Sequence, residues 1–157
     1  MGDDQSRAGE RYATAQIVDY CERVHAAPEP ALIQAFDTPE QHAMPPIMVG
    51  KSEAQFLRLL VQLHAPQKIV EVGTLAGFSA ISMAYALPKG GHLWTLENEP
   101  LHAEHAAQNL AAAGVADRVT LIEADAIEGL QQIEDQGPFD MVFLDADKER
   151  YDQYQTW

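Results

Sequence analysis

Residues 70–79 read VEVGTLAGFS, and they join a short apolar run to a helical stretch through a turn that contains two glycines. The apolar run covers residues 68–72, and the helical stretch covers residues 78–87. Gly73 and Gly77 permit a tight turn and a close approach of the backbone to a ligand. This order of strand, glycine turn and helix is typical of one unit of a parallel α/β sheet.

The same alternation of strand and helix continues along the chain. Further strands are predicted at 92–96, 119–123 and 141–144, with helices at 100–113 and 126–134 between them. Connections of this kind are right-handed, and strands that are apolar on both sides are covered by helices on both faces. The sequence therefore predicts an α/β fold with a parallel sheet between two layers of helices.

Helices are also expected before the sheet. Helical spacing of apolar residues predicts a helix over 13–24, and a short helix fits 30–36 between loop-forming prolines. A third helix is expected to begin at Ser52, the N-cap of a capping box that Gln55 completes, and to stop before Pro66.

Length and composition narrow the class of protein. The 157 residues are 46% hydrophobic and 22% charged, which is typical of a single globular domain. The formal net charge of −14 disfavours nucleic acids and anionic membranes as partners. Cys21 is the single cysteine, so an internal disulfide is excluded. Without a signal peptide or an apolar run of about 18 residues, the cytoplasm is the expected location.

Ligands of open α/β sheets bind beyond the carboxyl ends of the strands, so residues at those ends are the candidate site. The turn after the first strand is not a dinucleotide fingerprint, because that pattern needs glycine where the chain has Leu75 and Phe78. Taken alone, the turn fits an ordinary βα connection.

Carboxylates follow the next three predicted strands. Glu97 is placed to accept hydrogen bonds from a ribose diol, or it is a solvated strand-end acid. Ala126 would let a flat base lie against the chain with Asp125 at its edge, although Asp125 is equally suited to cap a helix. Asp145 offers an oxygen ligand for Mg²⁺ or Ca²⁺, or it forms a surface pair with Lys148.

The two histidines at positions 102 and 105 are three residues apart on a predicted helix. That spacing suits metal ligation, but neighbouring acidic residues indicate a solvent-facing side of the helix. We therefore expect His102 and His105 to lie in water.

Four segments and one tyrosine together resemble a known family. They are 48–50 (MVG), 70–79 (VEVGTLAGFS), 113–115 (AGV), 139–148 (FDMVFLDADK) and Tyr151. This ordered set is similar to the cation-dependent O-methyltransferases that use S-adenosylmethionine, the group that includes catechol and caffeoyl-CoA O-methyltransferases. The glycine motif alone is a weak signal, whereas the full set with D-A-D-K-x-x-Y at the fourth strand is specific.

The resemblance implies a Rossmann-like methyltransferase fold. Residues 51–157 would form an S-adenosylmethionine-binding domain, and residues 1–50 an N-terminal extension of helices and loops. The implied reaction moves a methyl group to the phenolic or catechol-type hydroxyl of a small molecule with the help of Mg²⁺ or another divalent cation. A homodimer is also expected, with residues before Pro46 shaping the acceptor pocket or the dimer contact.

The resemblance also assigns roles to ten residues. Asp145 would bind the metal and face the substrate, and Lys148 would be the general base. Glu97 would hold the ribose hydroxyls, Ala126 would flank the adenine, and Asp147 would line the cofactor pocket. The methionine part of the cofactor would contact Val49, Glu71, Gly73, Thr74 and Ser79.

The family has two more metal ligands, an Asp-Asn pair at the end of the next strand. The sequence stops before such a strand, so we expect the last strands of the family fold to be missing from this chain. Two alternatives remain open at this point. One is an NAD-dependent oxidoreductase, which the missing glycines disfavour, and the other is a non-catalytic remnant that binds S-adenosylmethionine.

Overall fold

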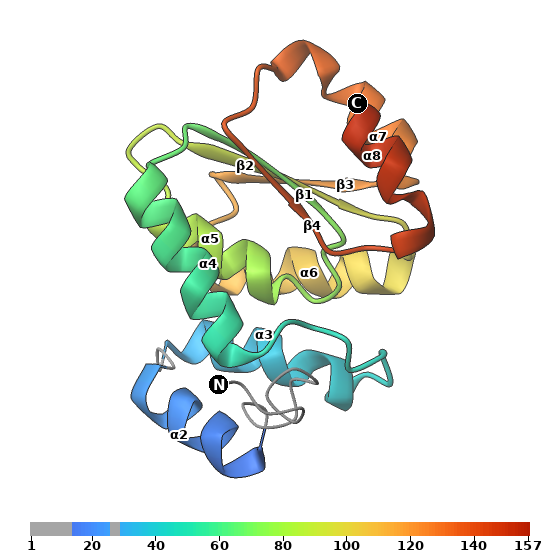
Figure 1. Cartoon of the computed structure of the whole chain (residues 1–157). Helices are drawn as coiled ribbons and strands as arrows, with labels where there is room; N and C mark the ends of the chain where they lie inside the picture. Colours follow the sequence, from blue (N-terminus) through green and yellow to red (C-terminus); the bar gives the residue numbers. More distant parts are fainter. Residues whose placement is uncertain (1–13, 26–28) are drawn as a thin grey trace, which may run out of the picture.

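The computed structural model describes residues 14–25 and 29–157, and within them a four-stranded parallel sheet is the centre of the molecule (Figure 1). The strands lie in the order β3-β2-β1-β4. Their bounds are Lys68–Val72 for β1, His92–Glu97 for β2, Val119–Glu123 for β3 and Met141–Leu144 for β4. The predicted strands and their parallel pairing are confirmed to within one residue.

Helices cover both faces of the sheet, as the sequence predicts. On one face, a core of buried side chains joins Ile69 and Leu93 of the strands to α3, α4, α5 and α6. On the other face, Val70 and Leu96 pack with residues of α7 and α8, among them the buried Tyr154. The helices are α2 (Ala15–His25), α3 (Pro30–Gln41), α4 (Lys51–His64), α5 (Phe78–Ala86), α6 (Pro100–Ala112), α7 (Ala126–Gln132) and α8 (Tyr151–Thr156), with short 3₁₀ turns η1 (Glu134–Gln136) and η2 (Lys148–Arg150).

Two predictions about the N-terminal helices are wrong. Helix α3 continues to Gln41 rather than ending at residue 36, and it carries Pro39 in its interior. Pro39 is buried, and α3 packs against α5 and α6. Burial of this face of the helix therefore offsets the backbone hydrogen bond that a proline cannot donate.

The start of α4 also differs from the prediction. Its N-cap is Gly50, whose N–H donates to the Glu53 carboxylate at 2.6 Å, so the reciprocal partner is Glu53 rather than Gln55. Ser52 lies inside the first turn, and its buried hydroxyl finds no hydrogen-bond partner among the residues that the structure describes. A capping box is identified in a sequence by two side chains, and glycine has none, so only Glu53 was left to indicate this N-cap.

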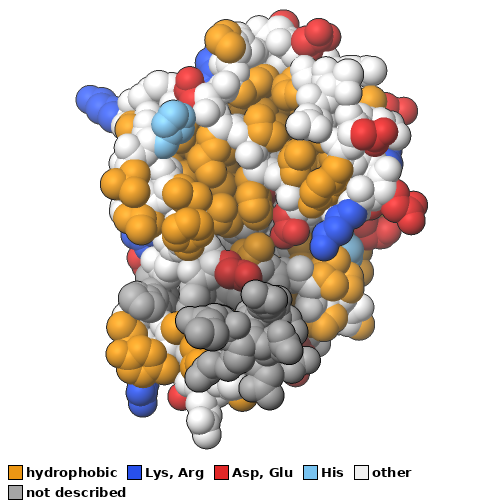
Figure 2. Space-filling view, in the orientation of Figure 1, with side chains coloured by type: hydrophobic (Ala, Val, Ile, Leu, Met, Phe, Trp, Pro, Cys, Tyr) orange, Lys and Arg blue, Asp and Glu red, His pale blue; other side chains and the backbone are white. Residues whose placement is uncertain are grey.

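Apolar side chains remain at the surface on one side of the molecule. Figure 2 shows hydrophobic side chains gathered over the region where α4 and the edge strand β4 lie in Figure 1. Phe56, Leu63 and Val142 are among the exposed residues. Within the part of the chain that the structure describes, no helix combines the length and the apolar character needed to span a membrane.

The end of β1 lies close against the end of β4. Gly73 has φ +96°, and its N–H donates to the carbonyl oxygen of Leu96 at 3.0 Å. A Cβ atom at this position would collide with the carbonyl oxygen of Asp145. The glycine is therefore required for both its backbone conformation and its lack of a side chain.

We expect Gly73→Ala to lower the free energy of unfolding by about 3 kcal/mol or more, because strain and a backbone collision add together. Gly114→Ala is the matched control, since Gly114 also has positive φ (+68°) but has no atom within 4 Å of an added Cβ. That control should lose only about 1 kcal/mol. Urea unfolding of both variants measures the difference, and equal losses would contradict the importance of the close approach.

Candidate active site

A cavity of about 740 Å³ lies at the carboxyl ends of the strands. It collects nine of the ten residues to which the family resemblance assigns roles, together with Ile47, Met48 and the apolar side chains of Phe78 and Leu96. The nine are Val49, Gly73, Thr74, Ser79, Glu97, Ala126, Asp145, Asp147 and Lys148. The remaining candidate, Glu71, does not line the cavity.

Glu71 lies behind the cavity wall and is fully buried. Its carboxylate accepts hydrogen bonds from the hydroxyls of Ser79 at 2.5 Å and Thr95 at 2.7 Å. Burial raises the pKa of Glu71 to about 7, although these two hydrogen bonds act in the opposite direction. Thr95 also lies 2.5 Å from the hydroxyl of Thr74, which does line the cavity. The geometry therefore favours an indirect role for Glu71, through the hydroxyls that it orients.

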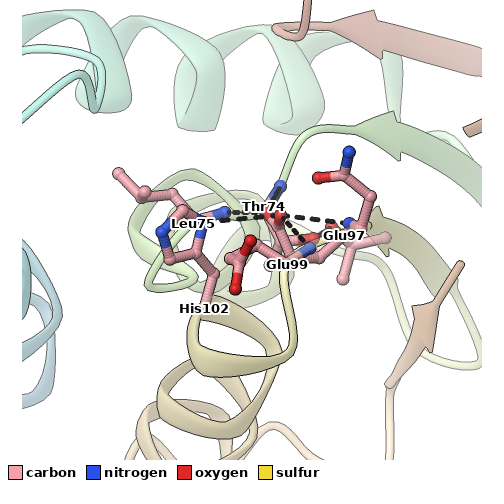
Figure 3. Close-up of polar contacts among 7 residues, drawn as sticks. Thr74, Leu75, Glu97, Glu99 and His102 are labelled. Carbon is pink, nitrogen blue, oxygen red and sulfur yellow. Dashed lines mark hydrogen bonds and ion pairs between the residues drawn. The ribbon is translucent and has the colours of Figure 1, made fainter. Parts of the chain in front are cut away.

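Glu97 joins the two loops that form the floor of the cavity. Its Oε2 atom accepts from the backbone N–H groups of Thr74 (3.3 Å) and Leu75 (2.8 Å) after β1 (Figure 3). Its Oε1 atom accepts from those of Asn98 and Glu99 after β2, both at 3.0 Å. The side chain is therefore a buried structural acceptor rather than a solvated acid. A ribose diol that binds here would have to replace some of these four hydrogen bonds.

His102 is a cavity residue that the sequence analysis placed wrongly. Its Nδ1 atom lies 3.5 Å from Oε1 of Glu97, and its side chain is 16% exposed. The first turn of α6 follows directly from the end of β2, so its inward side faces the strand ends. The place of His102 in this first turn was the feature of the sequence that could have identified it as a cavity residue. His105 instead stacks near His42, with ring centroids 4.0 Å apart.

Asp125 combines the helix-capping role with an ion pair. Its Oδ1 atom accepts from the N–H of Ile127 at 3.0 Å, which confirms it as the N-cap of α7. Arg150 donates to both carboxylate oxygens, and this ion pair holds the pKa of Asp125 down at about 2. Sequence analysis missed Arg150, because a pair formed across 25 residues leaves no local pattern.

The segment after β4 brings Asp145, Asp147 and Lys148 to the cavity. Loss of solvent raises the pKa of Asp145; the negative charge of Glu53 adds to this effect and the positive charge of Lys148 opposes it. Asp147 accepts from the hydroxyl of Tyr154 at 2.5 Å.

A divalent cation needs several oxygen ligands. Across residues 14–25 and 29–157 there is no group of three or more His, Cys, Asp or Glu side chains that could hold a metal ion. Asp145 as a metal ligand therefore stays a prediction, and the described residues do not form a cation site by themselves.

With this geometry in view, comparison with known proteins identifies the family. A family model described as O-methyltransferase matches residues 24–157. The chain belongs to this O-methyltransferase family. The cavity is thus the candidate active site of a family member, and the predicted methyltransferase fold is confirmed.

Individual relatives agree with this assignment. A catechol O-methyltransferase of Niastella koreensis is 46% identical over 129 residues, which is 81% of this chain and 58% of that protein. An O-methyltransferase of Bacillus cereus, solved in complex with S-adenosylhomocysteine, superimposes with a TM-score of 0.86 at 35% identity, over 90% of this chain and 66% of the other. The Streptomyces achromogenes enzyme TomG, solved with S-adenosylmethionine, gives 0.87 at 34% identity over 99% and 68%. The chain therefore spans only about 58% of the length of the curated relative.

The raised pKa of Glu71 predicts how stability depends on pH. The unfolded chain releases this proton near 4.5 and the folded protein near 7, so the folded state binds more protons between these values. Its contribution to stability is therefore lost as pH rises through that window. Glu71→Gln should lack this dependence, so the stability of the variant relative to wild type should rise by up to about 3 kcal/mol from about pH 5 to about pH 8.

Urea unfolding at the two pH values measures this change. Glu40→Gln, at an exposed acid on α3, is the matched control and should show no such trend. A constant difference between Glu71→Gln and wild type at both pH values would contradict the raised pKa.

Proposed function

We propose that this chain provides the S-adenosylmethionine site of an O-methyltransferase that acts on a phenolic or catechol-type hydroxyl of a small molecule. The observation that carries the proposal is that one cavity collects nine of the ten residues to which the resemblance assigns roles. Membership of the O-methyltransferase family supports the same reaction class. The ligands of the Bacillus cereus and Streptomyces achromogenes relatives support the cofactor.

The cavity suits this cofactor in size and in chemistry. Its volume of about 740 Å³ is in the range of small-molecule sites, which combine apolar walls with a few placed polar groups. The amino-acid end of the cofactor would meet Val49, Thr74 and Ser79. The ribose would meet Glu97, and the adenine would lie beside Ala126. When bound, S-adenosylmethionine supplies an electrophilic methyl group on a sulfonium.

The chain's own residues orient the reactants and remove a proton. A phenolic hydroxyl is a poor nucleophile until it is deprotonated, so a base is needed beside it. Lys148 is the proposed base: in its uncharged amine form, the lone pair of its Nζ atom would accept the proton from the acceptor hydroxyl, which gives an ammonium and a phenolate. Asp145 lies in the same segment and lines the cavity, and its carboxylate would orient the acceptor. Alignment of two reactants can supply about 7–11 kcal/mol, so this positioning is a large part of the proposed catalysis.

Binding is the first test of the proposal. S-adenosylhomocysteine should bind to the chain with a measurable heat in calorimetry and should raise its melting temperature, because it fills the cavity at the strand ends. NAD should do neither, because the turn at Gly73 lacks the glycines that a dinucleotide requires. Stabilisation by NAD alone would favour an oxidoreductase, and the absence of binding by S-adenosylhomocysteine would reject the proposed site.

Catalysis is tested separately with Lys148→Met. Methyl transfer from S-adenosylmethionine to a catechol should fall by at least about 100-fold, because the general base is removed. Affinity for S-adenosylhomocysteine should stay within about twofold, since uniform binding is retained. Lys89→Met, at an exposed turn residue away from the cavity, is the matched control and should keep its activity. If wild type binds the cofactor product but transfers no methyl group, the chain is a non-catalytic binding module.

A further inference from the structure

The ion pair between Asp125 and Arg150 connects the two outer strands of the sheet. Asp125 follows β3 and Arg150 follows β4, and these strands are separated by β2 and β1. Neighbouring strands lie about 4.8 Å apart, so the segment after β4 has to pass the ends of two strands to reach Asp125. In Figure 1 this segment (red) turns back from β4 and brings α8 next to α7. The pair therefore joins opposite sides of the cavity.

The contact is geometrically specific. The Nη1 atom of Arg150 lies 2.5 Å from Oδ2 of Asp125, and its Nη2 atom lies 2.9 Å from Oδ1. Two parallel hydrogen bonds of this kind fix both the distance and the orientation of the partners. Both side chains line the cavity and remain partly in water, at 32% and 39% exposure. Ion pairs at such positions contribute little to folding stability, so stability alone does not account for this arrangement.

Arg150 also contacts a tyrosine of α8 that is hydrogen-bonded to a second cavity carboxylate. Its guanidinium carbon lies 5.8 Å from the ring centroid of Tyr154, and the hydroxyl of Tyr154 donates to Asp147. Tyr151 adds a hydrogen bond from its hydroxyl to the carbonyl oxygen of Leu144 at 3.1 Å. One arginine is thus linked directly to Asp125 and, through Tyr154, to Asp147. Asp147 in turn precedes the proposed base, Lys148.

We propose that Arg150 is a positioning residue, a latch that holds the segment 145–150 across the cavity by its ion pair with Asp125. This role rests on the proposed function, since the latch closes over the nucleoside part of S-adenosylmethionine. The ion pair raises the affinity for the ligand, because it favours the arrangement in which the segment 145–150 lies across the cavity. The low pKa of Asp125 agrees with it, because the carboxylate stays charged at neutral pH.

Arg150→Gln tests the latch in calorimetric titrations with S-adenosylhomocysteine. We expect about tenfold weaker binding, with partial recovery in Arg150→Lys, which keeps the charge but not the two-pronged geometry. Asp125→Asn should weaken binding to a similar degree, and the double variant should lose little more. Wild-type affinity should fall between about 50 mM and about 500 mM salt, and Arg150→Gln should lose this dependence.

Arg58→Gln is the matched control. Arg58 also forms an ion pair, with Glu29 at 2.7 Å, and its guanidinium also lies over a tyrosine, Tyr85, at 5.6 Å. None of these three residues lines the cavity, so affinity should stay within about twofold of wild type. A merely structural role for Arg150 would not produce the change in salt dependence.

The possible outcomes separate the two proposals. If wild type binds S-adenosylhomocysteine and both Arg150→Gln and Asp125→Asn bind it equally well, the latch is wrong and the proposed function stands. If wild type does not bind it at all, the proposed function fails and the latch with it. Equal losses in Arg150→Gln and Arg58→Gln would also overturn the latch, because the effect would not depend on the cavity.

Discussion

The carboxylate of Glu97 is the interaction on which the cavity depends. Four backbone N–H groups, two from the loop after β1 and two from the loop after β2, converge on its two oxygens. Unpartnered N–H groups in this nearly buried position would be costly, so the acid satisfies both loops at once. The floor of the cavity therefore has one shape because a single side chain connects two neighbouring turns.

Acidic side chains are concentrated around the cavity at the carboxyl ends of the strands. Glu97, Asp125, Asp145 and Asp147 line the cavity, with Lys148, Arg150 and His102 as the nearby basic groups. The formal net charge of the chain is −14, so the long-range field adds to this local excess. Such a surface repels anions and attracts cations, which suits a sulfonium ligand better than a dinucleotide. The negative charge around the cavity and the missing glycines thus both favour a sulfonium ligand over a dinucleotide.

The sequence predicts the parts of the fold that depend on local patterns. Apolar runs located all four strands to within one residue, and the residues at their ends met in one cavity because parallel strands end at the same edge. Tertiary contacts determine what was missed: the burial of Pro39 extends α3, and Gly50 caps α4 without a side chain. Glu71 was assigned to the cavity, yet alternation along the strand and its hydroxyl partners place it behind the wall. Arg150 was missed because its partner, Asp125, follows the outer strand at the opposite edge of the sheet and is distant in the sequence.

The two buried carboxylates differ in the donors around them, and this difference explains their separate roles. The hydrogen-bond donors to Glu97 are four backbone N–H groups, whose positions are fixed by the two loops. The partners of Glu71 are hydroxyls, which rotate and can accept as well as donate. Glu71 can therefore gain or lose a proton near neutral pH while it keeps its contacts with the hydroxyls of Ser79 and Thr95. Ser79 and the pair of Thr74 and Thr95 connect this buried carboxylate to the wall of the cavity.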